Sequence, residues 1–151
     1  MAKDDVLPDV DHVVRYVKPS SIGEDGSING SEFRLRPARP DDRGVSVSWM
    51  EFYDPPPDKQ IVAIRSRARL TINKNGCYAR VNVGRVRYHL QTEAQVSVTF
   101  VHDPLPAEQQ KIEDCAHSLI CGLPTGDSPE AEEVGDLIAQ CVDEKYAAIA
   151  K

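Results

Sequence analysis

The chain has 151 residues, of which 40% are hydrophobic and 28% are charged, a composition typical of one compact domain. This composition excludes collagen-like, coiled-coil and fully disordered proteins. Four cysteines are too few for a disulfide scaffold, and the longest uncharged apolar run is far shorter than the ~20 residues that span a bilayer. The first residues also lack the apolar core of a signal peptide. We expect a single domain over residues 1–151 that is soluble and cytoplasmic, with free thiols and no membrane contact.

Charge is distributed unevenly along the chain. The formal net charge is -6, yet residues 34–87 contain 12 Lys and Arg against five Asp and Glu. The rest of the chain contains six basic and 19 acidic residues. A basic middle between acidic ends either faces an anionic partner or pairs with the chain's own carboxylates.

The first third of the chain predicts extended structure. Residues 1–31 are expected to form an extended segment, containing the apolar run 13–17, and a loop that dock on the body of the domain. Alternation of apolar and polar residues predicts one strand at 31–36 and another at 45–50. Their short spacing predicts that these two strands pair as a loose hairpin.

Residues 58–70 have two interpretations. After three prolines, Asp58 can cap a helix that places Ile61 and Ile64 on one face. Alternate positions also fit a strand with arginines on one side. We favour the helix.

The last half of the chain alternates between strand and helix signals. Asn75-Gly76 predicts a turn before a strand at 77–83, followed by a short helix at 85–93 and a buried strand at 96–101. No element is predicted between residues 107 and 125.

The final segment carries the clearest helix signal. Asp127 or Ser128 can serve as the N-cap and Pro129 as the first helical residue, and apolar residues recur at helical spacing as far as Tyr146. Together these elements predict an α+β fold, with a small, mostly antiparallel sheet packed by two or three helices.

The sharpest cluster of reactive residue types is His102, Asp103, Cys115 and His117. An imidazole can carry a proton, Asp103 or Asp114 can orient it, and Cys115 can act as nucleophile. A small hydrolase or transferase would need these side chains to converge within about 3 to 4 Å. The alternative is that they cap a strand or pack in the core.

The same segment contains zinc-ligand residue types. Cys115, His117 and Cys121, with His102, could supply four ligands. The paired ligands that structural zinc sites show at two separate places are not present here. We expect no metal and no cofactor.

A second candidate site is the arginine-rich middle together with an aromatic turn. Its candidate partner-binding residues are Arg65, Arg67, Arg69, Arg85, Arg87, Trp49 and Tyr53. Such cations could bind phosphates, but a pI near 5.2 and few aromatic residues favour an acidic protein partner over nucleic acid. Arginines that are solvated or paired within the chain are the simpler alternative.

Several stretches resemble a group of small uncharacterised bacterial proteins. They are residues 11–21, 32–37, 46–51, 82–84 and 102–106, among them Ser-Val-Ser-Trp-Met-Glu at 46–51 and His-Asp-Pro-Leu-Pro at 102–106. The resemblance assigns no activity and no site. It implies a bacterial cytoplasmic origin and a role beside other proteins in a multigene system.

These observations predict a non-enzymatic accessory or interaction protein of a bacterial multigene system, which binds an acidic protein partner. A small hydrolase or transferase is the alternative, and binding of nucleic acid or a nucleotide is a second one. The sequence leaves the oligomeric state open.

Overall fold

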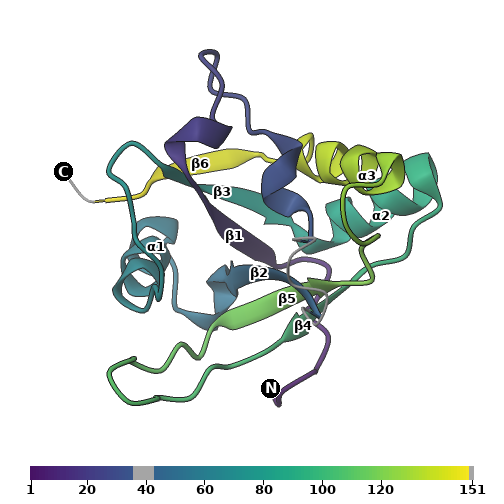
Figure 1. The fold of residues 1–151 in the computed structure, drawn as a ribbon. Helices are drawn as coiled ribbons and strands as arrows, with labels where there is room; N and C mark the ends of the chain where they lie inside the picture. Colours follow the sequence, from purple (N-terminus) through teal and green to yellow (C-terminus); the bar gives the residue numbers. More distant parts are fainter. Residues whose placement is uncertain (36–42, 150–151) are drawn as a thin grey trace.

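The computed structural model describes residues 1–35 and 43–149. They form one six-stranded sheet in the order β4-β5-β2-β1-β3-β6, and every neighbouring pair is antiparallel (Figure 1). The strands are β1 (His12–Val17), β2 (Gly44–Trp49), β3 (Cys77–Asn82), β4 (Thr99–His102), β5 (His117–Cys121) and β6 (Glu144–Ala147). The helices are α1 (Pro57–Ser66), α2 (Val83–Ala94) and α3 (Pro129–Ala139), with short 3-10 helices η1 (Pro19–Ser21), η2 (Gly30–Phe33) and η3 (Met50–Phe52). The predicted α+β fold is confirmed.

The helices cover both faces of the sheet. Consecutive strand residues point to opposite faces, so Val13 and Val14 of β1 mark one face each. Val13 belongs to the larger core, which includes residues of α2 and α3. Val14 packs instead with Ile61 and Ile64 of α1. We call these two sides the α2/α3 face and the α1 face, and Figure 1 shows the helices on either side of the sheet.

β1 lies near the centre of the sheet. It pairs with β2 on one side and with all six residues of β3 on the other. Val13, Val14 and Val17 are each at most 1% exposed because both faces of the strand are covered. The extended segment expected to dock on the body is therefore an internal strand. A strand buried on both faces shows a continuous apolar run rather than alternation, which is how residues 13–17 escape a strand prediction.

The predicted hairpin between 31–36 and 45–50 is wrong. The second strand exists as β2, but β2 pairs with β1 and β5. Residues 30–33 form η2, whose N-cap Asn29 accepts a hydrogen bond from the Ser31 amide at 2.9 Å. Phe33 and Leu35 are buried as the alternation suggested, but Phe33 ends η2 and Leu35 lies two residues after it, so their burial comes from a turn and not from a strand. Residue 36 lies outside the described residues.

The helix interpretation of the segment after the prolines is confirmed by α1. Pro57 is its first residue and Pro56 its N-cap, so Asp58 lies in the first turn. α1 ends at Ser66, and Leu70 lies beyond it in an exposed position.

The remaining elements follow the predicted order, with two exceptions. β3, α2 and β4 are confirmed, and Ser128 caps α3 by accepting from the Ala131 amide at 3.1 Å. β5 was not predicted, because its residues 118–120 are buried on both faces and show no alternation. α3 ends at Ala139 instead of continuing to Tyr146, because residues 144–147 pair with β3 as β6.

The N-terminal residues extend the sheet beyond β4. The Leu7 amide donates to Phe100 O at 2.8 Å, and the His102 amide donates to Asp5 O at 2.9 Å. The Leu7 side chain is 1% exposed, so it anchors this segment in the core. The outer edge of β4 is covered by the chain's own start. Within the described residues, no helix is long and apolar enough to cross a membrane.

η2 and α3 contact each other through two glycines. A Cβ added at Gly135 of α3 would lie 2.5 Å from Gly30 O, and one added at Gly30 would lie 2.6 Å from the Asp136 amide nitrogen. This close backbone approach fixes the path of the chain into Arg34 and Leu35, which line a groove on the α1 face.

We expect Gly135→Ala to destabilise the protein by about 1–3 kcal/mol, because the new methyl group would push η2 away from α3. Helix propensity alone would favour alanine by ~0.5–1 kcal/mol, so the sign of the change is diagnostic. The measurement is urea unfolding, with Glu133→Ala at an exposed position of α3 as the control. A stabilised Gly135→Ala protein would contradict the contact.

Candidate functional site

The antiparallel pairing of β4 and β5 separates the predicted reactive residues. His102 pairs with Ser118, and the Asp103 amide donates to His117 O at 2.9 Å. Adjacent residues of a strand point to opposite faces. Asp103 and His117 therefore share the α1 face, whereas His102 points to the other side, and the predicted residues do not converge on one point.

His102 is packed among aromatic rings. Its ring centroid lies 5.5 Å from that of Trp49 in an edge arrangement and 6.0 Å from that of Phe52 in a stacked one. The residue is 3% exposed, and its Nδ1 is buried without a hydrogen-bond partner. Burial, aided by the nearby N-terminal amino group, lowers the pKa of His102. The His102 ring is therefore a packing element of the core, in contact with Trp49 and Phe52.

Asp103 and His117 form a close pair. The His117 Nδ1 lies 3.2 Å from Asp103 Oδ2 and 2.9 Å from the Asp103 backbone O. The side chains of His117 and Asp103 are 14% and 15% exposed. The other carboxylate oxygen of Asp103 is 3.9 Å from Lys3 Nζ. The pair thus has the geometry in which a carboxylate orients an imidazole.

The thiols do not join this pair. Within the described residues, Cys115 makes no hydrogen bond or ion pair with His102 or His117, and all four cysteines are free. Burial raises the pKa of the Cys121 thiol, so it is a poor nucleophile near neutral pH. The described part of the chain also contains no group of three or more His, Cys, Asp or Glu side chains that could hold a metal ion.

His117 lines a groove of about 890 Å³ on the α1 face. Ser46 and Ser48 of β2 lie on its floor with His117, and residues 68–73 after α1 form part of its wall. Leu105, Lys111 and Asp114 of an arm, residues 103–116, also line the groove, and the Leu105 and Asp114 backbones exchange two hydrogen bonds of 2.9 Å within this arm. Figure 1 shows this arm between β4 and β5, extending to the side of α1.

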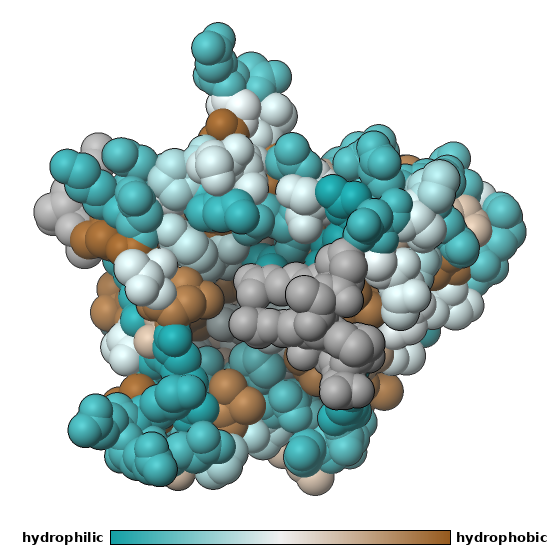
Figure 2. Space-filling view, viewed as in Figure 1, coloured by the Kyte–Doolittle hydropathy of each residue, from teal (hydrophilic) through white to brown (hydrophobic). Residues whose placement is uncertain are grey.

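Positive side chains are more numerous than negative ones along this groove. Lys18, Arg34 and Lys111 line it, and within the described part of the chain their side chains make no hydrogen bond or ion pair. Figure 2 shows hydrophilic residues over most of the visible face, with hydrophobic residues in small separate groups. The acidic side chains of the lining are Glu32 and Asp114.

Asp114 lies partly buried in this groove. Burial raises its pKa, and the effect is opposed by His117 and by a hydrogen bond from the Ala116 amide. Partial burial of an ionised carboxylate lowers the stability of the folded protein. Acidic residues with a raised pKa are enriched at binding and catalytic sites.

Four of the predicted partner-binding arginines bond to the protein's own backbone: Arg65, Arg67, Arg69 and Arg87, the last to Val98 O at 3.3 Å. Arg69 donates to Ile112 O and Pro106 O at 2.8 and 2.7 Å, which ties the arm to the end of α1. Arg67 contacts the Glu113 carbonyl and carboxylate at 3.4 and 3.9 Å. Arg65 donates to Ala147 O of β6 at 2.6 Å. The guanidinium groups of Arg65, Arg67 and Arg69 hold the arm and an edge strand in place.

Arg85 and Arg87 lie on α2, across the sheet from the other three. Arg87 pairs with Asp9 at 2.6 Å and Arg85 hydrogen-bonds the Cys141 thiol. The five arginines therefore form no single surface. The predicted aromatic residues are also largely enclosed, since Trp49 is 8% exposed and burial raises the pKa of Tyr53.

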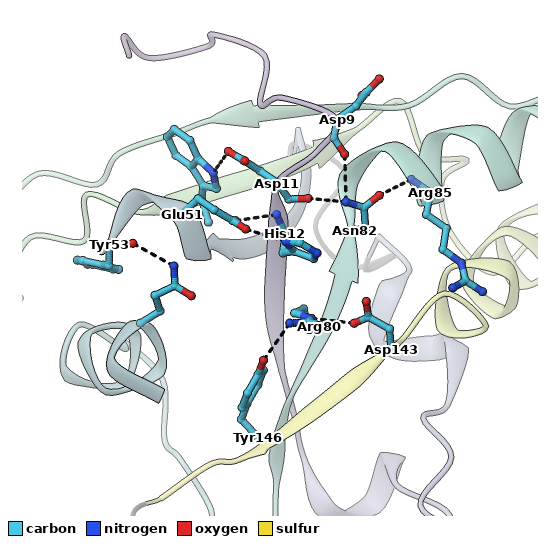
Figure 3. Close-up of polar contacts among 12 residues, drawn as sticks. Asp9, Asp11, His12, Glu51, Tyr53, Arg80, Asn82, Arg85, Asp143 and Tyr146 are labelled. Atoms are coloured by element: carbon cyan, nitrogen blue, oxygen red, sulfur yellow. Dashed lines mark hydrogen bonds and ion pairs between the residues drawn. The ribbon is translucent and has the colours of Figure 1, made fainter. Parts of the chain in front are cut away.

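Three of the stretches that carry the resemblance, 11–21, 46–51 and 82–84, meet around β1. The Trp49 indole N–H donates to Asp11 at 2.9 Å, and both Glu51 carboxylate oxygens contact His12, at its amide and its Nδ1, each at 2.7 Å. Figure 3 shows these groups beside Asn82, which donates to the carbonyl of Asp11 and caps α2. These short motifs hold β1, β2 and β3 in register.

Sequence reasoning missed four of the groove residues, namely Ser48, Lys18, Arg34 and Lys111. A signal existed for Ser48, since the alternation of Val45, Val47 and Trp49 with serines predicts one polar face on this strand. Nothing in the sequence shows that this face floors a groove. Lys18 and Lys111 are 93 positions apart and meet only through the fold.

Comparison with known proteins gives no further guidance. No protein-family model, no curated protein and no solved structure matches the chain.

We expect the stability of the protein to fall as the pH drops below the ordinary His pKa of 6.5, towards the lowered pKa of His102. In that window the unfolded chain binds a proton that the folded protein excludes, so stability rises with pH and then levels off above it. Urea unfolding at several pH values measures this slope. His102→Phe should flatten it, while His89→Gln on α2 should not. Equal slopes for wild type and His102→Phe would contradict the assignment.

We expect Asp114→Asn to stabilise the protein at pH 7. The raised pKa means that the folded protein loses stability as the pH rises from the ordinary Asp value of 3.8 through the pKa of Asp114, and the loss persists above it. The amide removes that loss and can still accept from Ala116. Thermal unfolding should show a higher midpoint at pH 7 and a shrinking difference towards pH 4, with the exposed Glu113→Gln as control. A destabilised Asp114→Asn at pH 7 would refute the burial argument.

Proposed function

We propose that this protein binds an acidic segment of a partner protein in the groove on the α1 face. The observation that carries the proposal is the set of three cations, Lys18, Arg34 and Lys111, that line the groove without partners in the described part of the chain. They come from the turn after β1, the end of η2 and the arm, so the fold gathers them from distant parts of the sequence.

The shape and the field of the groove support this proposal. Its volume of about 890 Å³ is at the upper end of the range for small-molecule pockets, so it has room for several residues of an extended segment. The whole chain carries a formal charge of -6. A concave positive region on such a protein focuses the field on one place and directs an anionic ligand there.

This proposal keeps the acidic protein partner expected from the sequence and changes the residues that contact it. Arg67 and Arg69 shape the groove by holding the arm, Arg65 holds β6, and the unpaired cations Lys18, Arg34 and Lys111 are the ones that meet the partner. An accessory role in a bacterial multigene system, in the cytoplasm, is the setting that the resemblance of the short motifs supports.

The proposal predicts that a fluorescein-labelled hexaglutamate peptide binds at low ionic strength and is released as salt is added. Lys18→Glu, Arg34→Glu and Lys111→Glu combined should lower the affinity at least about tenfold, since like charges then face the ligand. Lys59→Glu, on α1 and outside the groove lining, is the matched control with the same change per site. Fluorescence anisotropy measures the affinities.

Two outcomes would overturn the proposal. One is that Lys59→Glu weakens peptide binding as much as the average single substitution in the triple groove variant does. Such a result would show a general effect of net charge and not a site in the groove. The other is a single-stranded oligonucleotide that binds the same groove more tightly than the peptide at equal charge, which would favour nucleic-acid binding instead.

A further inference from the structure

We propose that Ser48 and His117, on the floor of the groove, form with the adjacent Asp103 a hydrolytic site that cleaves esters carrying negative charge. The proposal shares the groove and its cations with the binding function above, but the chemical step depends on different residues. It also differs from the enzyme reading of the sequence, because a serine hydroxyl takes the place of the Cys115 thiol.

The three residues come from three adjacent strands. β4, β5 and β2 are neighbours in the sheet. Ser48 of β2 pairs directly with His117 of β5, and Asp103, which follows β4, lies opposite His117 on the other side. The side chains of directly opposed residues point to the same face. The carboxylate, the imidazole and the hydroxyl therefore follow one another in a row across the α1 face.

The imidazole is oriented within this row. Its Nδ1 lies 2.9 Å from Asp103 O and 3.2 Å from Asp103 Oδ2, on the β4 side. The two ring nitrogens occupy different edges of the ring, so Nε2 is free of that contact. In a carboxylate-imidazole-hydroxyl site, the carboxylate fixes the tautomer in this way and leaves Nε2 to accept a proton.

The strand register places Ser48 next to His117. Directly opposed residues in an antiparallel pair have Cβ atoms about 4.5–5.5 Å apart, a spacing that the serine hydroxyl can close by turning about its own Cα–Cβ bond while the imidazole keeps its contact with Asp103. Ser48 and His117 both line the groove, and within the described residues the Ser48 hydroxyl makes no hydrogen bond. Hydrogen bonds of this kind are often open in a site without substrate.

Ser46 provides an internal comparison. It lies on the same face of the same strand and also lines the groove, but it pairs with Leu119. It has the same hydroxyl and is more exposed than Ser48, but its cross-strand neighbour is not a base. We therefore expect Ser48, and not Ser46, to act as the nucleophile on the floor of the groove.

The reaction balances with water as the second reactant. The Ser48 Oγ–H proton moves to His117 as Oγ bonds the ester carbon, and the leaving alcohol takes that proton as its C–O bond breaks. Water then attacks the acyl-serine, giving its proton to His117, and the proton returns to Ser48 as the carboxylic acid leaves. Asp103 stays ionised throughout and acts as a positioning residue.

The cations of the groove indicate the substrate class. Lys18, Arg34 and Lys111 line the same cavity as Ser48 and His117. They would hold a carboxylate or phosphate of the substrate apart from the ester group. We therefore expect an anionic ester to react faster than a neutral one of the same leaving group.

The first test uses a fluorophosphonate probe on the intact protein, followed by mass spectrometry of its peptides. We expect one adduct, on Ser48, which Ser48→Ala abolishes and Ser46→Ala does not. His117→Gln should slow the labelling on the order of 10²–10⁴-fold. Asp103→Asn should slow it as well, and Asp103→Glu should restore part of the rate, which a purely structural role would not produce. Thermal unfolding verifies that each variant is folded.

The second test compares hydrolysis of 4-nitrophenyl acetate with that of mono(4-nitrophenyl) glutarate. The wild type should prefer the anionic ester, and the Lys18, Arg34 and Lys111 charge reversal should remove the preference while the Ser48 adduct still forms. An unlabelled Ser48 in folded protein, or labelling that does not depend on His117, would overturn the hydrolytic site. Hexaglutamate binding that survives Ser48→Ala would leave the binding function standing, so the two proposals can fail separately.

Discussion

The burial of β1 between two helical layers is the constraint on which the molecule depends. β1 pairs along both edges, and its valines alternate between the core under α2 and α3 and the core under α1. Next to β1, the carboxylate of Asp11 accepts a hydrogen bond from the Trp49 indole N–H, and His12 contacts Glu51. The end of β2 is therefore fixed by side-chain contacts as well as by the backbone hydrogen bonds of the sheet. Because β2 is held in this register, Ser48 lies opposite His117 and the groove has a defined floor.

Positive charge in this protein has two separate uses. The arginines at the end of α1 and just after it donate to backbone carbonyls of β6 and of the arm, which would otherwise need water as their partner. A guanidinium has five donors in a fixed plane and suits this work. Three other cations without partners in the described residues, Lys18, Arg34 and Lys111, line the groove. A count of basic residues along the sequence mixes these two groups.

Local signals in the sequence predicted most of the elements, and the failures share a cause. α1, α2, β3 and the start of α3 follow from capping residues, turn residues and helical spacing, which act within a few positions. β1 and β5 are buried on both faces and lack alternation, whereas residues 31–35 alternate but form the end of η2 and the two residues after it. The candidate site was predicted in part. The Asp103 and His117 pair was among the residues expected to react, but its neighbours Ser48, Lys18 and Arg34 are brought there by strand order, which no local pattern encodes.

The N-terminal residues that run along β4 have a consequence for self-association. A sheet with two bare edges can add strands at both and grow without limit. Here residues 4–7 occupy one edge, and the other belongs to β6, a strand of four residues that includes Glu144 and Lys145. If two copies paired through β6, each would cover the β6 edge of the other, and no uncovered edge would remain for a third copy. The fold therefore favours closure at a dimer over growth into a fibre.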